Sequence, residues 1–214
     1  MPDCPSVIAF FAKLQAWITE NAPDVTFRPP ANPATIEDFT AKSSLNLPED
    51  LRKILLMADG ETRKSAGGIG NWRLMPIAEI QVAWGWLTQM AAKGAFTKLI
   101  PQASPYLQVA WWHPGWVPFV TSDAGDYFCI DTQPPEHDRY GQILLFFQYR
   151  PERPLVAANL EAWLDRITRD LSTGIYTYDE VTGFDGEGFL WSALEGKHLL
   201  DNPEGRFIAE DSDQ

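Results

Sequence analysis

Residues 111–142 read WWHPGWVPFVTSDAGDYFCIDTQPPEHDRYGQ and carry the strongest structural signal of the chain. Two short apolar runs, at 116–120 and 127–130, are separated by a turn rich in Asp and Gly. A Pro-rich acidic loop then leads to a third apolar run at 143–149. Short apolar runs bounded by turn residues are typical of β-strands. These residues therefore predict a three-stranded antiparallel meander.

Amphipathic helices surround this meander in the sequence. Apolar residues recur at helical spacing, and they predict helices at about 6–22, 35–42, 48–59, 77–93 and 159–171. The order is helices first, then the meander, then a closing helix. This order predicts the α+β class, with an antiparallel-rich sheet packed against N-terminal and C-terminal helices.

The chain divides into a main body and an acidic extension. With 214 residues, 45% of them hydrophobic, it is long enough for one domain with a sizeable core. We expect that domain to span residues 1–171, including the N-terminal helix. Residues 172–214 form the extension: from Asp170 onward, eleven acidic residues face only two basic ones. Its apolar residues at 184–194 predict a short helix that packs back on the domain.

The charge of the chain indicates which partners it suits. A formal net charge of −12 disfavours nucleic acid and anionic membranes, because both are bound through Lys and Arg. The same charge would attract a basic protein. The two cysteines, Cys4 and Cys129, form neither a disulfide framework nor a metal motif. Together with the absence of a signal-peptide pattern or a membrane-length apolar run, they predict a cytoplasmic protein with a buried thiol at Cys129.

A search for catalytic motifs predicts no enzyme. The three histidines, His113, His137 and His198, lie outside any metal-binding spacing. The glycine run at 67–70 could form a phosphate nest, but it lacks the Lys-Ser/Thr ending of a P-loop. Asp residues in the meander do not match a calcium-binding loop. We therefore predict no catalytic, cofactor-binding or metal-binding residues.

Four short motifs follow one another along the chain. They are a Leu-Pro helix start at Leu47, a glycine after that helix at Gly60, a strand that ends in Asp131, and Gly141-Gln142 before the next strand. Their order resembles the SUKH superfamily, which includes Smi/Knr-type cell-wall-assembly regulators and bacterial immunity proteins. The resemblance covers roughly residues 36–170. It implies an α+β layer and a binding protein.

Three functional hypotheses remain open. The first, favoured by the resemblance and the acidity, is a bacterial immunity protein that neutralises a cognate toxin, a basic nuclease or deaminase, by stoichiometric binding. The second is a regulatory or scaffold module of the cell-wall or signalling type. The third is an enzyme or small-molecule binder that uses the aromatic region near Trp112 and His113.

The acidic loops are the best candidates for a partner-binding surface, because binding residues concentrate on loops. Asp123 and Asp126 occupy one turn of the meander, and Glu136 and Asp138 occupy the other. An aromatic residue could serve as the central anchor of the interface. The candidates for that role are Trp111, Trp112 and Tyr140.

Overall fold

Five α-helices and a five-stranded antiparallel sheet make up the main body of the computed structural model. The structure describes residues 6–22, 25–62, 67–69, 72–102, 105–173, 176–180 and 189–193. The helices are α1 (Val7–Asn21), α2 (Pro33–Ser43), α3 (Glu49–Met57), α4 (Ile77–Ala92) and α5 (Leu160–Ser172). The predicted α+β class is confirmed.

The sheet contains the predicted meander with one further strand on each side. Its order follows the chain, and every neighbouring pair is antiparallel. The strands are β1 (Arg73–Leu74), β2 (Trp116–Thr121), β3 (Tyr127–Asp131), β4 (Ile143–Phe146) and β5 (Leu155–Ala157). A 3-10 helix, η1 (His137–Arg139), lies in the connection between β3 and β4.

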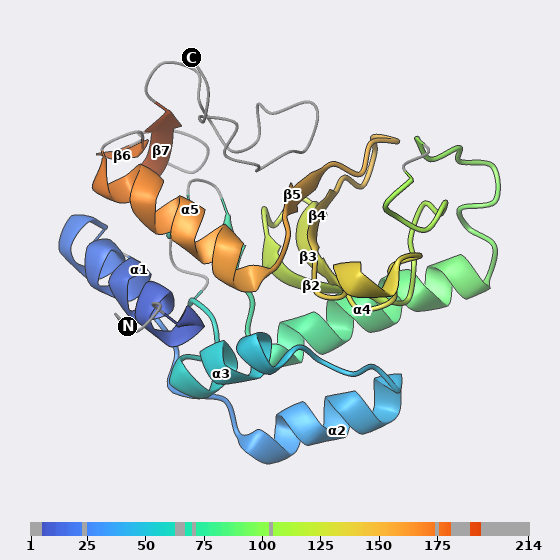
Figure 1. The fold of residues 1–214 in the computed structure, drawn as a ribbon, viewed down its shortest axis with the longest axis horizontal. Coiled ribbons are helices and arrows are strands. Elements are labelled where there is room, and N and C mark those ends of the chain that lie inside the picture. The colour runs from blue at the N-terminus through green and yellow to red at the C-terminus, as the bar shows by residue number, and fades with distance from the viewer. Residues whose placement is uncertain are drawn as a thin grey trace.

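Both faces of the sheet are buried, because side chains alternate between two cores along each strand. Phe128 and Ile130 of β3 lie in the main core, which also contains residues of α1, α3 and α5. Figure 1 shows α1 and α5 side by side on this side of the sheet, with α3 below them. Trp163 of α5 is fully buried here, and its ring centroid lies 5.1 Å from that of Phe119.

The opposite face of the sheet contacts a smaller core formed with α4 and the segment before β2. Its members are Leu87, Leu107, Trp111, Trp112, Trp116, Cys129, Leu144 and Phe146. Cys129 is a free, fully buried cysteine, as predicted, and burial raises the pKa of its thiol well above the ordinary value. The aromatic residues before β2 are therefore structural side chains of a second hydrophobic layer.

The start of α2 differs from the prediction. The apolar spacing predicted a helix from about residue 35, but the helix begins at Pro33. Asn32 is the N-cap, since its Oδ1 accepts a hydrogen bond of 3.0 Å from the Ala34 N–H. Proline suits the first turn of a helix because the missing N–H has no partner there in any case.

Part of the acidic extension forms a hairpin. Strand β6 (Tyr176–Glu180) pairs with β7 (Phe189–Ala193) in a separate two-stranded sheet. The short helix predicted for 184–194 is therefore wrong at 189–193, where the chain pairs with β6 as a strand. Residues 181–188 and 194–214 lie outside the described residues, and the division of the chain at residue 171 stays a prediction. No helix in the described part of the chain has the length and apolarity to cross a bilayer.

Candidate functional site

The turn between β2 and β3 is held by a buried arginine. Residue Arg73 pairs with Thr121 across the β1–β2 ladder, which sets its side chain beside this turn. Its Nη2 and Nε donate to the two carboxylate oxygens of Asp123, at 2.8 and 3.2 Å. Nη2 also donates to Glu79 Oε2 on α4, at 2.8 Å. Only 1% of the Arg73 side chain is exposed, so this cation joins the hairpin to α4 from inside the fold.

Two carboxylates, those of Asp123 and Glu79, bind the Arg73 guanidinium in this ion cluster. Burial alone would lower the pKa of Arg73, but hydrogen bonds to Asp123 and Glu79 raise it above its ordinary value. The backbone of Asp123 has a φ of +58°, a left-handed conformation that Asp tolerates better than most residues. Its carboxylate therefore contributes to the geometry of the turn, although the side chain remains 54% exposed.

Asp126, the second predicted acid of this turn, also has a partner within the chain. Its Oδ1 accepts a 2.8 Å hydrogen bond from the Gln148 N–H, which ties the turn to the segment after β4. Gly125 precedes it with a φ of +93°, and an added Cβ would lie 1.6 Å from the Gln148 side chain. The turn is thus closely packed against its neighbour, and both of its acids hold it in place.

The other predicted acids lie at the far end of β3. Because successive turns of a meander lie at opposite ends of the strand they share, the five residues of β3 separate the two acidic turns by about 16 Å. Glu136 and Asp138 belong to the β3–β4 connection, and both are exposed. The structure therefore does not bring the four predicted acids together.

The β3–β4 connection is anchored on two sides. The Tyr140 hydroxyl donates to the Asn46 carbonyl, in the segment between α2 and α3. Arg139 donates from Nε to Glu136 Oε2 at 2.7 Å, and its guanidinium lies 4.0 Å from the ring centroid of Tyr106. These contacts present the exposed acids on a fixed loop.

A buried polar cluster lies at the base of this connection. Asp131, fully buried at the end of β3, accepts hydrogen bonds of 3.0 Å from Gln142 Nε2 and from the Gln133 N–H. The Gln142 amide also donates to the Tyr106 carbonyl at 2.8 Å. Burial raises the pKa of Asp131, while these two hydrogen bonds oppose that effect. Asp131, which ends β3, and Gln142 of the Gly-Gln motif thus hold the two ends of the β3–β4 connection together.

Trp112, the predicted aromatic anchor, lies in the second core. Its side chain is 3% exposed, and its Nε1 donates to Thr88 Oγ1 on α4 at 3.2 Å. Trp111 is 8% exposed and its carbonyl accepts two hydrogen bonds from the buried Arg153. Of the three candidate anchors, Tyr140 is the most accessible, and it is half-buried.

The structure identifies a buried carboxylate that sequence patterns missed. Glu61 is fully buried, and its oxygens accept hydrogen bonds from the Gly68 N–H at 2.8 Å and the Leu74 N–H at 3.2 Å. Burial raises its pKa from 4.5 to about 7, against the opposing effect of those hydrogen bonds. The glycine run considered as a phosphate nest therefore binds the chain's own carboxylate at Gly68.

Two further features bear on chemistry. Among the described residues, no group of three or more His, Cys, Asp and Glu side chains could hold a metal ion. A small apolar cavity lies between α3, α5 and the β1–β2 edge, with Leu55, Phe119 and Trp163 in its lining. This cavity is not lined by Trp112 or His113, where the sequence placed a small-molecule site.

Comparison with known proteins adds a family and a set of fungal relatives. The SMI1/KNR4 family (SUKH-1) matches residues 30–166. A glucan synthesis regulatory protein of Neurospora crassa is 26% identical over 220 residues, which cover 85% of this chain and 41% of that protein. The cell wall biosynthesis/cell cycle regulator smi1 of Schizosaccharomyces pombe is 24% identical over 192 residues, covering 82% of this chain and 38% of that protein.

A KNR4/SMI1 homolog of Kluyveromyces lactis is 35% identical over 86 residues, or 39% of this chain and 16% of that protein. The chain thus spans about two fifths of the length of the first two relatives. These relatives are named as regulators, which agrees with the regulatory hypothesis better than with the bacterial immunity hypothesis. The family match covers α2, the whole five-stranded sheet and about half of α5, well over half of the chain. This protein belongs to the SMI1/KNR4 (SUKH-1) family.

Proposed function

We propose that this protein is a non-catalytic, protein-binding module of a regulator of cell-wall synthesis or signalling. The observation that carries the proposal is the family match over residues 30–166, the region that contains the five-stranded sheet, helices α2 to α4 and part of α5. Two relatives aligned over most of this chain are named as regulators of glucan synthesis and of cell wall biosynthesis and the cell cycle. This chain spans only part of the length of those proteins. That it shares their regulatory activity is therefore part of the proposal.

We place the partner on the η1 surface, which we define as Glu136, Asp138 and Tyr140. Glu136 is 54% exposed and its ion pair with Arg139 lies on the surface, where such pairs contribute little. The loop is held by the Tyr140–Asn46 hydrogen bond, so binding would require little ordering of the backbone. At the opposite turn, Asp123 and Asp126 are less suitable because both carboxylates hold the fold together.

A basic partner fits this surface best. The chain carries a formal net charge of −12, which raises the rate of encounter with a positively charged protein at low salt. The same charge supports toxin neutralisation as a second candidate function. The names of the fungal relatives favour the regulatory candidate.

Affinity capture from the cytoplasm of the source organism tests the proposal. The bait is the full chain, compared with the variant Glu136→Lys/Asp138→Lys and with a control, Glu20→Lys/Glu37→Lys, that has the same net charge change at exposed helix positions. We expect wall-synthesis or signalling proteins with the wild type and the control, and their loss with the first variant. Recovery of a secreted nuclease or deaminase instead would support the toxin candidate and overturn the regulatory one.

A further inference from the structure

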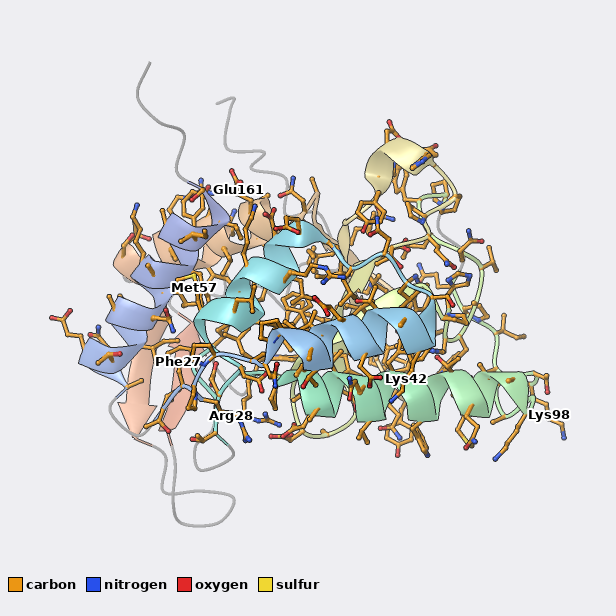
Figure 2. The ribbon with its side chains drawn as sticks, turned by 90° about the horizontal axis from the view of Figure 1, so that it is seen from below. Phe27, Arg28, Lys42, Met57, Lys98 and Glu161 are labelled. Carbon is orange, nitrogen blue, oxygen red and sulfur yellow. The ribbon has the colours of Figure 1, made fainter. Side chains whose placement is uncertain are left out.

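The segment that follows α4 carries cations in a stretch of sequence without acids. Residues 80–122 contain no Asp or Glu, although these two residue types make up 29 of the 214 residues of the chain. The Lys and Arg residues of this stretch are Lys93 and Lys98, and both are exposed. Figure 2 shows Lys98 at the margin of the molecule, beyond the C-terminal end of α4. An acidic protein therefore presents a local positive surface here.

These two cations are not neutralised by their surroundings. An exposed lysine elsewhere in the fold, Lys42, pairs with Asp38 of the same helix at 2.6 Å. Within the part of the chain that the structure describes, neither Lys93 nor Lys98 forms an ion pair. Their charges are therefore available to a carboxylate from outside the described residues.

Two exposed apolar side chains directly follow the second lysine. Leu99 is 41% exposed and Ile100 is 84% exposed. The segment that carries them is held in place, because Phe96 packs against the second core and the Gln102 N–H donates to the Pro151 carbonyl at 2.9 Å. Binding to this segment would therefore require little ordering of the backbone. We define the post-α4 surface by four residues: Lys93, Lys98, Leu99 and Ile100.

The acidic extension contains a segment of matching chemistry. Residues 1–169 carry 15 basic and 18 acidic side chains, so the extension accounts for most of the net charge of −12. In residues 194–214, which lie outside the described residues, two large apolar side chains come just before three acids. In order they are Phe207, Ile208, Glu210, Asp211 and Asp213. This segment is the complement of the post-α4 surface, where two apolar side chains lie next to cations.

We propose that residues 207–213 bind to the post-α4 surface of the same chain. The two apolar side chains of the segment pack on Leu99 and Ile100, and its carboxylates lie beside the two lysines. A partner of similar chemistry must then displace this segment before it can bind there. The post-α4 surface shares no residue with the η1 surface, so this inference does not depend on the partner proposed for that surface.

The connecting chain is long enough for this contact. Figure 1 shows β7 and the C-terminal end of α4 on different sides of the fold. Phe207 follows the end of β7 at Ala193 by fourteen residues, which span up to about 45 Å when extended, roughly the diameter of a compact domain of this size. A covalent connection also raises the effective concentration of the segment to about the millimolar range. A contact too weak to hold a separate peptide can therefore form within the chain.

Paramagnetic relaxation enhancement in the full chain tests the contact. A nitroxide is attached at Ser212→Cys in a Cys4→Ser background, where the remaining cysteine, Cys129, is fully buried. We expect the nitroxide to broaden the backbone amide signals of residues 97–100. Raising the salt concentration from about 0.1 to about 1 M shortens the Debye length from about 10 to about 3 Å and should weaken this broadening.

Two results of this experiment would overturn the proposal. One is the absence of broadening at residues 97–100. The other is broadening of the same signals in a mixture of two chains, one isotope-labelled without the nitroxide and one carrying the nitroxide without the isotope, because the contact would then belong to a second copy.

Charge reversal in the same nitroxide-labelled chain tests the role of the two lysines. Lys93→Glu/Lys98→Glu should lower the equilibrium constant for docking at least about threefold, a modest effect because exposed ion pairs contribute little. The control Lys13→Glu/Arg28→Glu makes the same change in net charge at exposed positions elsewhere in the fold and should leave the broadening unchanged. Broadening that Lys93→Glu/Lys98→Glu leaves intact contradicts the proposal.

Reversing the charges on both sides distinguishes a direct contact from a general effect of net charge. Glu210→Lys/Asp211→Lys alone should weaken the broadening. Combined with Lys93→Glu/Lys98→Glu, it should restore the broadening, as expected for groups that contact each other. Two effects that simply add would contradict the contact.

Discussion

Replacing Glu61 with glutamine should change how the stability of this protein depends on pH. The Glu61 carboxylate is fully buried and accepts hydrogen bonds from the backbone N–H groups of Gly68 and Leu74. Burial penalises its charged form, so its pKa rises from 4.5 to about 7 in the folded protein. In the E61Q variant the side chain keeps its shape and has no charge at any pH.

The sign and the size of the effect follow from linkage between protonation and folding. Between pH 4.5 and about 7, folded Glu61 holds a proton that the unfolded side chain has lost. The contribution of Glu61 to the free energy of unfolding is therefore fully present below pH 4.5, and it is lost as the pH rises through about 7. At about 1.4 kcal/mol per pH unit, the loss amounts to about 3 kcal/mol.

Urea denaturation of the wild type and E61Q at a series of pH values from 4.5 to 8 measures this effect. The amide loses one of the two hydrogen bonds, which lowers the stability of E61Q by a similar amount at every pH. We therefore use the difference in unfolding free energy between the two proteins. That difference should shift by about 3 kcal/mol in favour of E61Q across the range.

Two results would refute this reasoning. A difference that does not change with pH would mean that Glu61 ionises at an ordinary pKa, as an exposed carboxylate does. A shift in favour of the wild type would mean that the Gly68 and Leu74 hydrogen bonds outweigh the cost of burial. NMR titration of the Glu61 side-chain carboxyl carbon gives the pKa directly and distinguishes the two cases.

Three further predictions concern stability. Arg73→Leu should lower the unfolding free energy by about 3 kcal/mol, because it removes the buried cation that two carboxylates bind. Asp123→Asn should lower it by only about 1 kcal/mol. Equal losses for the two variants in urea denaturation would contradict the ion cluster. Tyr140→Phe should cost about 1 kcal/mol through loss of the hydrogen bond to the Asn46 carbonyl, and an unchanged thermal midpoint would count against that anchor. Gly85→Ala should raise the unfolding free energy by about 1 kcal/mol in urea denaturation, because an added Cβ meets no atom within 4 Å among the described residues. Destabilisation would show that the site is not open.

The spacing of apolar residues predicted helices and strands correctly where a segment follows a single periodicity, either helical or strand-like. The meander and the helix of α5 follow from apolar spacing. The start predicted at about residue 159 agrees with the structure, where Asn159 Oδ1 accepts a hydrogen bond from the Ala162 N–H at 2.8 Å. β5 was not predicted, because three residues between Pro154 and α5 carry too short a pattern. The predicted start of α2 was wrong because both Asn32-Pro33 and Thr35 could begin a helix. The sequence alone does not decide between them, and in the folded chain Asn32 is the N-cap.

The candidate site was less predictable, because its contacts are distant in sequence. Arg73 and Asp123 are 50 residues apart, and no local pattern identifies the arginine as buried. The acids of both turns looked alike in the sequence. The structure distinguishes them: Asp126 accepts a hydrogen bond from a backbone N–H, whereas Glu136 forms an ion pair at the surface. The partner-binding role of these residues stays a prediction.

The dissociation constant of the captured partner, measured by titration calorimetry with purified proteins, tests the central claim most directly. The account predicts a complex of fixed stoichiometry that Glu136→Lys/Asp138→Lys weakens at least about tenfold while the control Glu20→Lys/Glu37→Lys binds nearly as tightly as the wild type. Equal weakening by both double variants would mean that only overall charge matters. In that case the η1 surface is not the binding site.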